Sequence, residues 1–263
     1  MRQNYAKSLL GVVLAGMLLC TSCQSSRRVA KGGYGLAKVE GSMIRIDKEW
    51  DASPDASALL LLTPYKAKID SMMYEVIGTS REKMEKGKPE SLLSNLVADV
   101  LRQAAAKVLG RPADMGLVNM GGLRTILPAG PITVGTVYEI LPFENSLCVM
   151  TMKGTHLKSL LASIASLRGE GVSGVRLEIT KDGKLLSATV GGQRVEDDKL
   201  YTVSTIDYLA DGNGRMDAFL QAEKRVCPEG ATLRGLFLEY VRAQTAAGKQ
   251  VTSGLDGRIR IVR

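Results

Sequence analysis

Apolar residues recur with helical spacing in two long stretches of the chain. Between Glu90 and Leu109 they fall three or four positions apart, which predicts an amphipathic helix. From Thr63 onward a second set has the same spacing: Ile69, Met72, Met73, Val76 and Ile77. Thr63 and the proline after it predict a capped start for this second helix. We expect its apolar stripe to pack on its own domain, the alternative being contact with another protein.

Short apolar runs bounded by turn residues predict β-strands. They are Met115–Val118, Leu147–Met152, Val175–Thr180, Leu185–Val190, Leu200–Ile206 and Arg258–Val262. The Asp-Gly pair within Lys181–Lys184 is typical of a tight hairpin turn between two of these strands. Further helices are expected at Thr155–Leu167, at Thr232–Thr245 and just before Pro142. The sum predicts an α+β domain with mixed sheets and interleaved helices.

The amino-terminal residues follow the layout of a secretory signal. Arg2 and Lys7 precede an apolar run, Leu9–Leu19, that is too short to span a bilayer stably. A small residue directly precedes Cys23, which resembles the lipobox of bacterial lipoproteins, where the cysteine is acylated and becomes the first mature residue. Cys20 follows a leucine and fits that pattern less well. The alternative is an ordinary cleaved signal with unmodified cysteines.

This pattern divides the chain into three parts. We expect a lipoprotein signal peptide over residues 1–23, a tether and extension over 24–62, and a folded domain over 63–263. Met43–Asp55, which contains Trp50, predicts an edge strand followed by a turn. The layout predicts that the chain starts at its own export signal and is anchored by lipid to the bacterial cell envelope, at the outer membrane or cell surface.

Composition narrows the class of protein. The apolar fraction of 45% suffices for a sizeable core, and loss of Arg2 and Lys7 with the signal reduces the net charge from +8 to +6. Sparse aromatic residues and scattered lysines do not match a nucleic-acid-binding module. Cys148 lies in an apolar strand pattern, so we expect it to pack in the core without pairing with Cys227.

Two short segments have the composition of ligand-binding loops. In the first, Asn119-Met-Gly-Gly-Leu-Arg124, Gly121 and Gly122 allow close approach of the backbone to a ligand, and Arg124 can bind an anion with its planar fork. In the second, Leu141-Pro-Phe-Glu-Asn145, an aromatic ring stands near an amide after the end of a helix.

These segments resemble the C-terminal, substrate-binding domain of the 5'-nucleotidase and UDP-sugar hydrolase family. The segment Glu90–Asp99 resembles the opening of a family helix, and Tyr201–Gly212 resembles the last segment that contacts the ligand. The resemblance runs from about Ile69 to Arg263, with the four motifs in the family's order.

The resemblance implies a nucleotide pocket. Phe143 and Tyr208 match the two aromatic residues that sandwich the nucleobase, and Asn119 matches an amide that contacts base or ribose. Arg124 matches an arginine near the ribose and phosphate. Gly121, Gly122, Asn145 and Asn213 complete the expected substrate-binding set.

The last loop departs from the family's pattern. Its usual Gly-Gly-Asp-Gly, with an aspartate that bonds the ribose hydroxyls, is replaced by Gly-Asn-Gly-Arg, so that Gly214 stands at the aspartate position. Asp211 or Asp217 are candidates to substitute for it, and Asn213 has donors and acceptors suited to a ribose hydroxyl. Some relatives also carry an arginine near the position of Leu92. Its absence implies weaker phosphate binding or a preference for an uncharged nucleoside.

The family's catalytic part does not match this chain. In the family, a separate N-terminal domain holds two metal ions with several His, Asp and Asn side chains. Here the sequence has one histidine, His156, expected at a surface near a helix start. We therefore expect no catalytic residues, no metal site and no cofactor in this chain, and divalent metals only in a partner.

Three functions remain open from sequence. The first is the nucleotide-recognition half of a split 5'-nucleotidase, completed by a separate metallophosphatase. The second is a non-catalytic nucleotide- or nucleoside-binding lipoprotein, and the third a structural envelope lipoprotein with a decayed pocket. The expected partners are thus a nucleotide or nucleoside, a possible phosphatase subunit and, through the lipid, a membrane, with no nucleic acid.

Overall fold

A computed structural model describes residues 40–262, apart from the side chain of Asp51. The chain divides into two compact units, Met1–Pro54 and Asp55–Arg263. In the described part of the first unit, the element is a short 3-10 helix, η1, Trp50–Ala52. The expected edge strand at Met43–Asp55 is wrong, because these residues pair with no strand and those whose side chains are described are exposed. Cys23 and the start of the tether lie outside the described residues.

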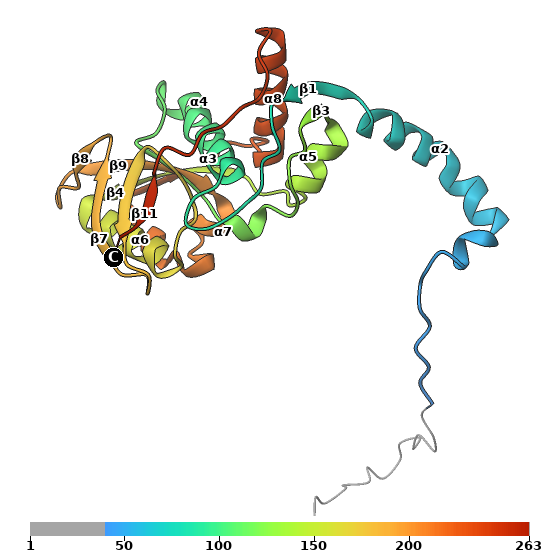
Figure 1. Cartoon of the computed structure of the whole chain (residues 1–263), viewed down its shortest axis with the longest axis horizontal. Helices are drawn as coiled ribbons and strands as arrows, with labels where there is room; N and C mark the ends of the chain where they lie inside the picture. Colours follow the sequence, from blue (N-terminus) through green and yellow to red (C-terminus); the bar gives the residue numbers. More distant parts are fainter. Residues whose placement is uncertain (1–39, 263) are drawn as a thin grey trace, which may run out of the picture. The chain divides into compact units, whose positions relative to one another are not determined.

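The second unit holds helices, strands and 3-10 turns in alternation (Figure 1). Its helices are α2 (Ala56–Met73), α3 (Leu92–Ala104), α4 (Ala106–Leu109), α5 (Val134–Ile140), α6 (Gly154–Ser166), α7 (Asp207–Ala210) and α8 (Leu233–Ala246). Its 3-10 turns are η2 (Met120–Gly122), η3 (Asn213–Arg215) and η4 (Asp217–Gln221). Among residues 40–262, no helix combines the length and the apolar character needed to cross a membrane.

Three sheets carry this unit. The largest has the order β10-β4-β9-β2-β5, built from β10 (Lys224–Val226), β4 (Leu147–Lys153), β9 (Leu200–Ile206), β2 (Met115–Val118) and β5 (Gly171–Ser173). A second sheet has the order β11-β6-β7-β8, built from β11 (Ile259–Ile261), β6 (Val175–Ile179), β7 (Leu185–Val190) and β8 (Gln193–Arg194). A two-stranded pair joins β1 (Val76–Ser80) to β3 (Gly130–Thr133).

The strand pattern follows from burial on each face. β2 is buried along its whole length because it lies inside the five-stranded sheet, whereas β6 alternates buried and exposed positions. The β6–β7 hairpin turns at Gly183, whose φ of 90° needs a residue without a side chain, as the Asp-Gly pair predicts. Helix α6 contacts strands of both larger sheets.

Helix α3 packs on the five-stranded sheet and against α8. Its approach to β2 depends on Gly116, where a Cβ atom would lie 2.4 Å from the carbonyl oxygen of Ala98. Ser91 caps the helix through its side chain, and Leu93, Leu96, Val97 and Leu101 face the core. The amphipathic helix predicted from the sequence is therefore confirmed, although it breaks into α3 and α4 near Ala105.

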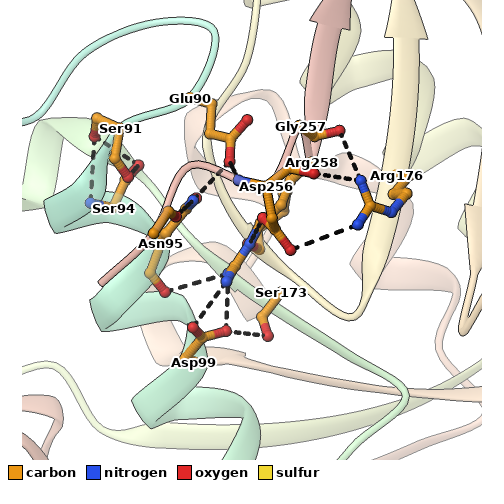
Figure 2. A network of polar contacts seen from close by, with 12 residues as sticks. Glu90, Ser91, Ser94, Asn95, Asp99, Ser173, Arg176, Asp256, Gly257 and Arg258 are labelled. Atoms are coloured by element: carbon orange, nitrogen blue, oxygen red, sulfur yellow. Dashed lines mark hydrogen bonds and ion pairs between the residues drawn. The ribbon is translucent and has the colours of Figure 1, made fainter. Parts of the chain in front are cut away.

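A partly buried arginine, Arg258, ties the carboxyl-terminal segment to this core (Figure 2). The two terminal nitrogens of Arg258 bind the two carboxylate oxygens of Asp99, each at 2.8 Å. The same guanidinium donates to the carbonyl of Val172 at 2.8 Å and to Asp256 at 2.9 Å. Arg258 thus links α3, β5 and the approach to β11 with a bidentate pair, the strongest geometry available to arginine.

Helix α2 differs from its prediction in both position and packing. It begins at Ala56, capped by Asp55, and Pro64 lies inside it rather than at its start. It ends at Met73, so the last two apolar positions of the predicted helix lie in β1. The expectation that its stripe packs on its own domain is wrong for most of its length. Ile69 and Met72 are more than half exposed, and of the predicted stripe residues on α2, Met73 packs against the core.

Cys148 and Cys227 form a disulfide, which corrects the expectation of unpaired cysteines. Cys148 is buried on β4, and β10 pairs antiparallel with β4 so that Val226 lies opposite Val149. Continuing that register by one residue places Cys227 opposite Cys148. The pairing could not be inferred from the sequence because β10 itself, a three-residue edge strand of mostly charged residues, has no apolar pattern.

Candidate functional site

Three loops distant in sequence meet at one edge of the five-stranded sheet. β2 and β9 are parallel neighbours, with Met115 opposite Val203, so their carboxyl ends reach the same edge. β4 runs antiparallel to β9, with Leu147 opposite Ile206, so the residues before β4 lie at that edge too. In sheets with parallel strands, ligands commonly bind beyond the carboxyl ends. The two sequence motifs and the segment after β9 therefore converge where a ligand site is expected.

A pocket of about 310 Å³ opens at this edge. It is lined by Asn119, Gly121, Gly122, Phe143, Asn145 and Tyr208. These are six of the eight substrate-binding residues predicted from the sequence, brought together from two loops and the short helix α7. Phe143 and Tyr208 are 48% and 44% exposed as residues, so neither side chain is buried in the core. None of the six lining side chains is charged at neutral pH, which suits a flat, uncharged ring.

Arg124 lies beside the pocket rather than in its lining. Its guanidinium carbon is 5.9 Å from the centre of the Phe143 ring, and its Nη1 donates to the carbonyl of Gly121 at 3.4 Å. The Arg124 amide also donates to the carbonyl of Ile140 at 3.0 Å, which joins the first loop to the end of α5. Its positive charge is therefore held at the rim, next to one aromatic wall.

Asn213 also lies outside the lining, in the loop that follows Tyr208. This loop is close to the pocket, because a Cβ atom at Gly214 would lie 3.7 Å from Cε1 of the Tyr208 ring. Asp211, one of two candidates for the family's ribose-binding aspartate, instead accepts a hydrogen bond from Arg225 Nη1 at 2.5 Å. This exposed ion pair joins Oδ1 of the carboxylate to Arg225 on β10.

The side chain of Asn119 has an unsatisfied acceptor. Within residues 40–262 its Oδ1 is buried and has no hydrogen-bond partner, although buried polar atoms are nearly always paired. The amide lies against the two glycines, since a Cβ atom at Gly122 would come within 3.2 Å of Oδ1. An N–H or O–H donor of a ligand would remove the desolvation penalty of this oxygen.

Arg234, which sequence reasoning missed, supports the second loop. From the first turn of α8 it donates to the carbonyls of Leu141 and Pro142 at 3.3 and 3.1 Å. Its guanidinium also stacks on Tyr138, 4.1 Å from the ring centre. These contacts fix the turn that presents Phe143. No local signal marks the residue, because the turn it holds lies about ninety positions earlier in the chain.

A second cavity, of about 280 Å³, is lined in part by the Arg258 network of Figure 2. Most of its charged groups pair with one another: Arg258 binds Asp99 and Asp256, and Arg176 lies 3.7 Å from Asp256. Arg102 donates to the carbonyl of Ala113. The sequence pattern associates none of these residues with a ligand. The cavity at the sheet edge is therefore the better candidate for a binding site.

Within the part of the chain that the structure describes, metal-ligating side chains form no cluster. Among the described residues, no group of three or more His, Cys, Asp and Glu side chains is placed to hold a metal ion. His156 is half-buried in the first turn of α6 and does not line the pocket.

Comparison with known proteins places the fold. A family model described as 5'-nucleotidase, C-terminal domain, matches residues 74–221, more than half of the 263-residue chain. Endonuclease YhcR of Bacillus subtilis (strain 168) is 31% identical over 187 residues, which cover 68% of this chain and 15% of YhcR. Protein UshA of Yersinia enterocolitica is 28% identical over 189 residues, covering 68% of this chain and 34% of UshA.

A solved structure has a similar fold. The 5'-nucleotidase precursor from Thermus thermophilus superposes with a TM-score of 0.67 at 27% identity, covering 81% of this chain and 45% of that one. The chain therefore spans about a third or less of these two curated relatives and less than half of this solved structure. The mixed fold with interleaved helices predicted from the sequence is confirmed.

Proposed function

Since this chain belongs to the 5'-nucleotidase C-terminal domain family, we propose that it is the nucleotide-recognition half of a split 5'-nucleotidase. The observation that carries the proposal is the pocket at the sheet edge, where Asn119, Phe143 and Tyr208 meet from three loops. A flat base fits between two half-exposed rings, because every nucleobase offers a π face for stacking.

Each pocket residue has a distinct role in this proposal. Phe143 and Tyr208 stack on the two faces of the base, while the buried Asn119 Oδ1 accepts a hydrogen bond from the base or ribose. Gly121 and Gly122 let the ligand approach the backbone. Arg124, at the rim beside Phe143, attracts the 5'-phosphate and orients it away from the apolar walls.

We further propose that phosphate hydrolysis is carried out by a separate metallophosphatase. Two-metal hydrolysis needs several imidazoles and carboxylates around two ions, and this sequence has one histidine. The exposed apolar face of α2, with Leu60, Leu61, Tyr65 and Ile69, is a candidate surface for that subunit, since such faces are uncommon on monomers without a partner. On its own the chain would bind nucleotides without hydrolysing them.

The proposed location is the bacterial cell envelope, with Cys23 carrying the lipid. Its sequence context supports acylation, and more than one acyl chain is needed for a stable anchor. The Cys148–Cys227 disulfide supports export, because such bonds persist in oxidising compartments.

A second candidate function is a non-catalytic binding lipoprotein. Gly214, in place of the family's aspartate, favours it, since it removes a carboxylate from the ribose, and the neighbouring candidate Asp211 is engaged by Arg225 through Oδ1. Without that contact and without a cation at Leu92, an uncharged nucleoside would bind nearly as well as its 5'-phosphate.

Calorimetric titration of the lipid-free protein with AMP, adenosine and UDP-glucose tests the pocket. Loss of one stacking ring removes about 1–3 kcal/mol, so Phe143→Ala and Tyr208→Ala should each weaken affinity for a bound base by about 5- to 150-fold. Tyr74→Ala is the matched control, because that tyrosine is 75% exposed and does not line the pocket. Affinity unchanged in both pocket variants would refute the clamp.

A reconstitution assay separates the two candidate functions. The partner to try is an exported metallophosphatase that lacks its own C-terminal domain, encoded next to this chain. The split-enzyme proposal expects phosphate release from AMP by the mixture and little from either protein alone. Robust metal-dependent hydrolysis by this chain alone, or no gain on mixing, would leave the binding lipoprotein in its place.

A further inference from the structure

The loop that carries Asn119 begins with a buried amide. Met120 is 6% exposed and opens the 3-10 turn η2, so its N–H has no partner within the turn. Glu170, in the segment between α6 and β5, accepts this N–H on Oε2 at 2.5 Å. A carboxylate bound to an N–H at the start of a turn is a charge-assisted hydrogen bond, stronger than one between neutral groups.

A lysine holds the same loop from a different segment. Lys86, which lies before α3, donates to the carbonyl of Met120 at 3.4 Å and also to the carbonyl of Leu123. The turn that presents Gly121 and Gly122 to the pocket is thus held by an acceptor at its first N–H and by a donor at two of its carbonyls. Neither charged side chain lines the pocket.

Glu170 lies at a buried position, which disfavours a charged carboxylate. Glu170 is 8% exposed, and burial raises its pKa above the ordinary value, although the Met120 N–H and the Lys88 ammonium, 3.8 Å away, oppose that rise. Lys88 itself also donates to the carbonyl of Leu167. Apolar side chains of similar volume often stabilise such positions equally well. A role in the geometry of the loop accounts for a carboxylate here.

We propose that Glu170 and Lys86 are positioning residues that hold the Asn119–Gly122 loop in the geometry required for nucleotide binding. This inference rests on the proposed function of the pocket and extends it to residues outside the lining. Affinity for the nucleotide then depends on two contacts of charged side chains with the backbone of Met120. Asn119 precedes Met120 in this loop, and the two glycines follow it.

Four variants titrated with AMP test the proposal. Glu170→Leu removes the acceptor and should weaken AMP affinity about tenfold or more, whereas Glu170→Gln keeps an acceptor and should stay within about threefold. Lys86→Met keeps the apolar stem of an exposed side chain and should weaken affinity severalfold without unfolding the protein. Asp114→Asn is the control for lost stability, because Asp114 lies at the opposite end of β2 from the pocket.

Amide NMR spectra supply a second readout that does not depend on the ligand. Glu170→Leu should shift the resonances of Gly121 and Gly122, while Asp114→Asn should leave them in place. If the folded Glu170→Leu protein binds AMP as the unmodified protein does, or if the two glycine amides do not move, the positioning role is refuted. If the unmodified protein binds no nucleotide yet the glycine amides shift, the proposed function fails and the control of loop geometry stands.

Discussion

Opening the Cys148–Cys227 disulfide should cost this domain a large part of its stability. The bond closes a loop with a sequence separation of 79 residues. The chain-entropy model for a loop of that length gives about 4.5 kcal/mol at room temperature. Native domains have free energies of unfolding of about 5–15 kcal/mol, so the effect should be plain in any equilibrium measurement.

Urea unfolding with and without reductant measures the effect. With a slope of about 2 kcal/mol per molar urea, the midpoint should fall by about 2 M on reduction. Cys227→Ser should reproduce the shift, since Cys227 is exposed and its replacement opens no cavity. Adding reductant to that variant should then have no further effect, which separates the disulfide from other actions of the reagent.

The three-residue strand β10 should report the same change locally. It lies at the edge of the sheet and is held to β4 by a short ladder next to the disulfide. Its amides should exchange faster after reduction, before those of β9. Two free thiols in the unreduced, unfolded protein would show that the disulfide is absent. A stability loss below about 1 kcal/mol in Cys227→Ser would show that the disulfide contributes little, and either result would contradict the prediction.

Three further outcomes are expected. Burial raises the pKa of Asp114, but hydrogen bonds from the N–H and hydroxyl of Thr202, together with the hydrogen bond and charge of Arg111, outweigh it and leave the pKa below the ordinary value. The contribution of Asp114 to stability is thus present above the unfolded pKa and lost as pH falls through the folded pKa. Acid unfolding curves of Asp114→Asn should therefore show a weaker pH dependence and a loss of about 1–2 kcal/mol at neutral pH. Gly116→Ala should destabilise the domain by about 1–3 kcal/mol in urea, because its methyl group would meet the carbonyl of Ala98. Arg234→Met should lower AMP affinity in calorimetry with a small change in melting temperature, since it frees the turn that carries the aromatic ring of the second loop.

The sequence predicted the elements whose signal is local. The strands Met115–Val118, Leu185–Val190 and Leu200–Ile206 have the bounds expected from their apolar runs, and the helix over Glu90–Leu109 is present as α3 and α4. The helix is marked by apolar residues three to four positions apart, and the strands by short apolar runs bounded by turn residues. The hairpin turn at Gly183 was likewise marked by its own residues.

Elements whose partners are distant could not be predicted this way. β1 continues the helical spacing of α2, and it becomes a strand because β3, more than fifty residues later, pairs with it. The β10 edge strand and its disulfide also depend on a remote neighbour. Residues 43–55 were expected to include a strand, but no partner strand pairs with them. They form no strand, and their described side chains are exposed.

The pocket is lined by residues that the sequence predicted and supported by residues that it did not. Six lining residues were expected because two motifs and an aromatic segment resemble a known family, and the sheet register explains why they converge. The supporting residues Glu170, Lys86 and Arg234 were not expected, because each acts on the backbone of a loop far away in sequence. Side chains that bind a backbone leave no pattern of residue types at either end.

A crystal structure of this chain with AMP is the direct test of the proposed nucleotide pocket. The adenine ring is expected between Phe143 and Tyr208, with a donor of the ligand near Asn119 Oδ1 and the phosphate on the side of Arg124. AMP bound elsewhere, for example in the cavity around Arg258, would contradict it. So would an unchanged, ligand-free pocket in crystals grown at an AMP concentration that saturates the protein in solution.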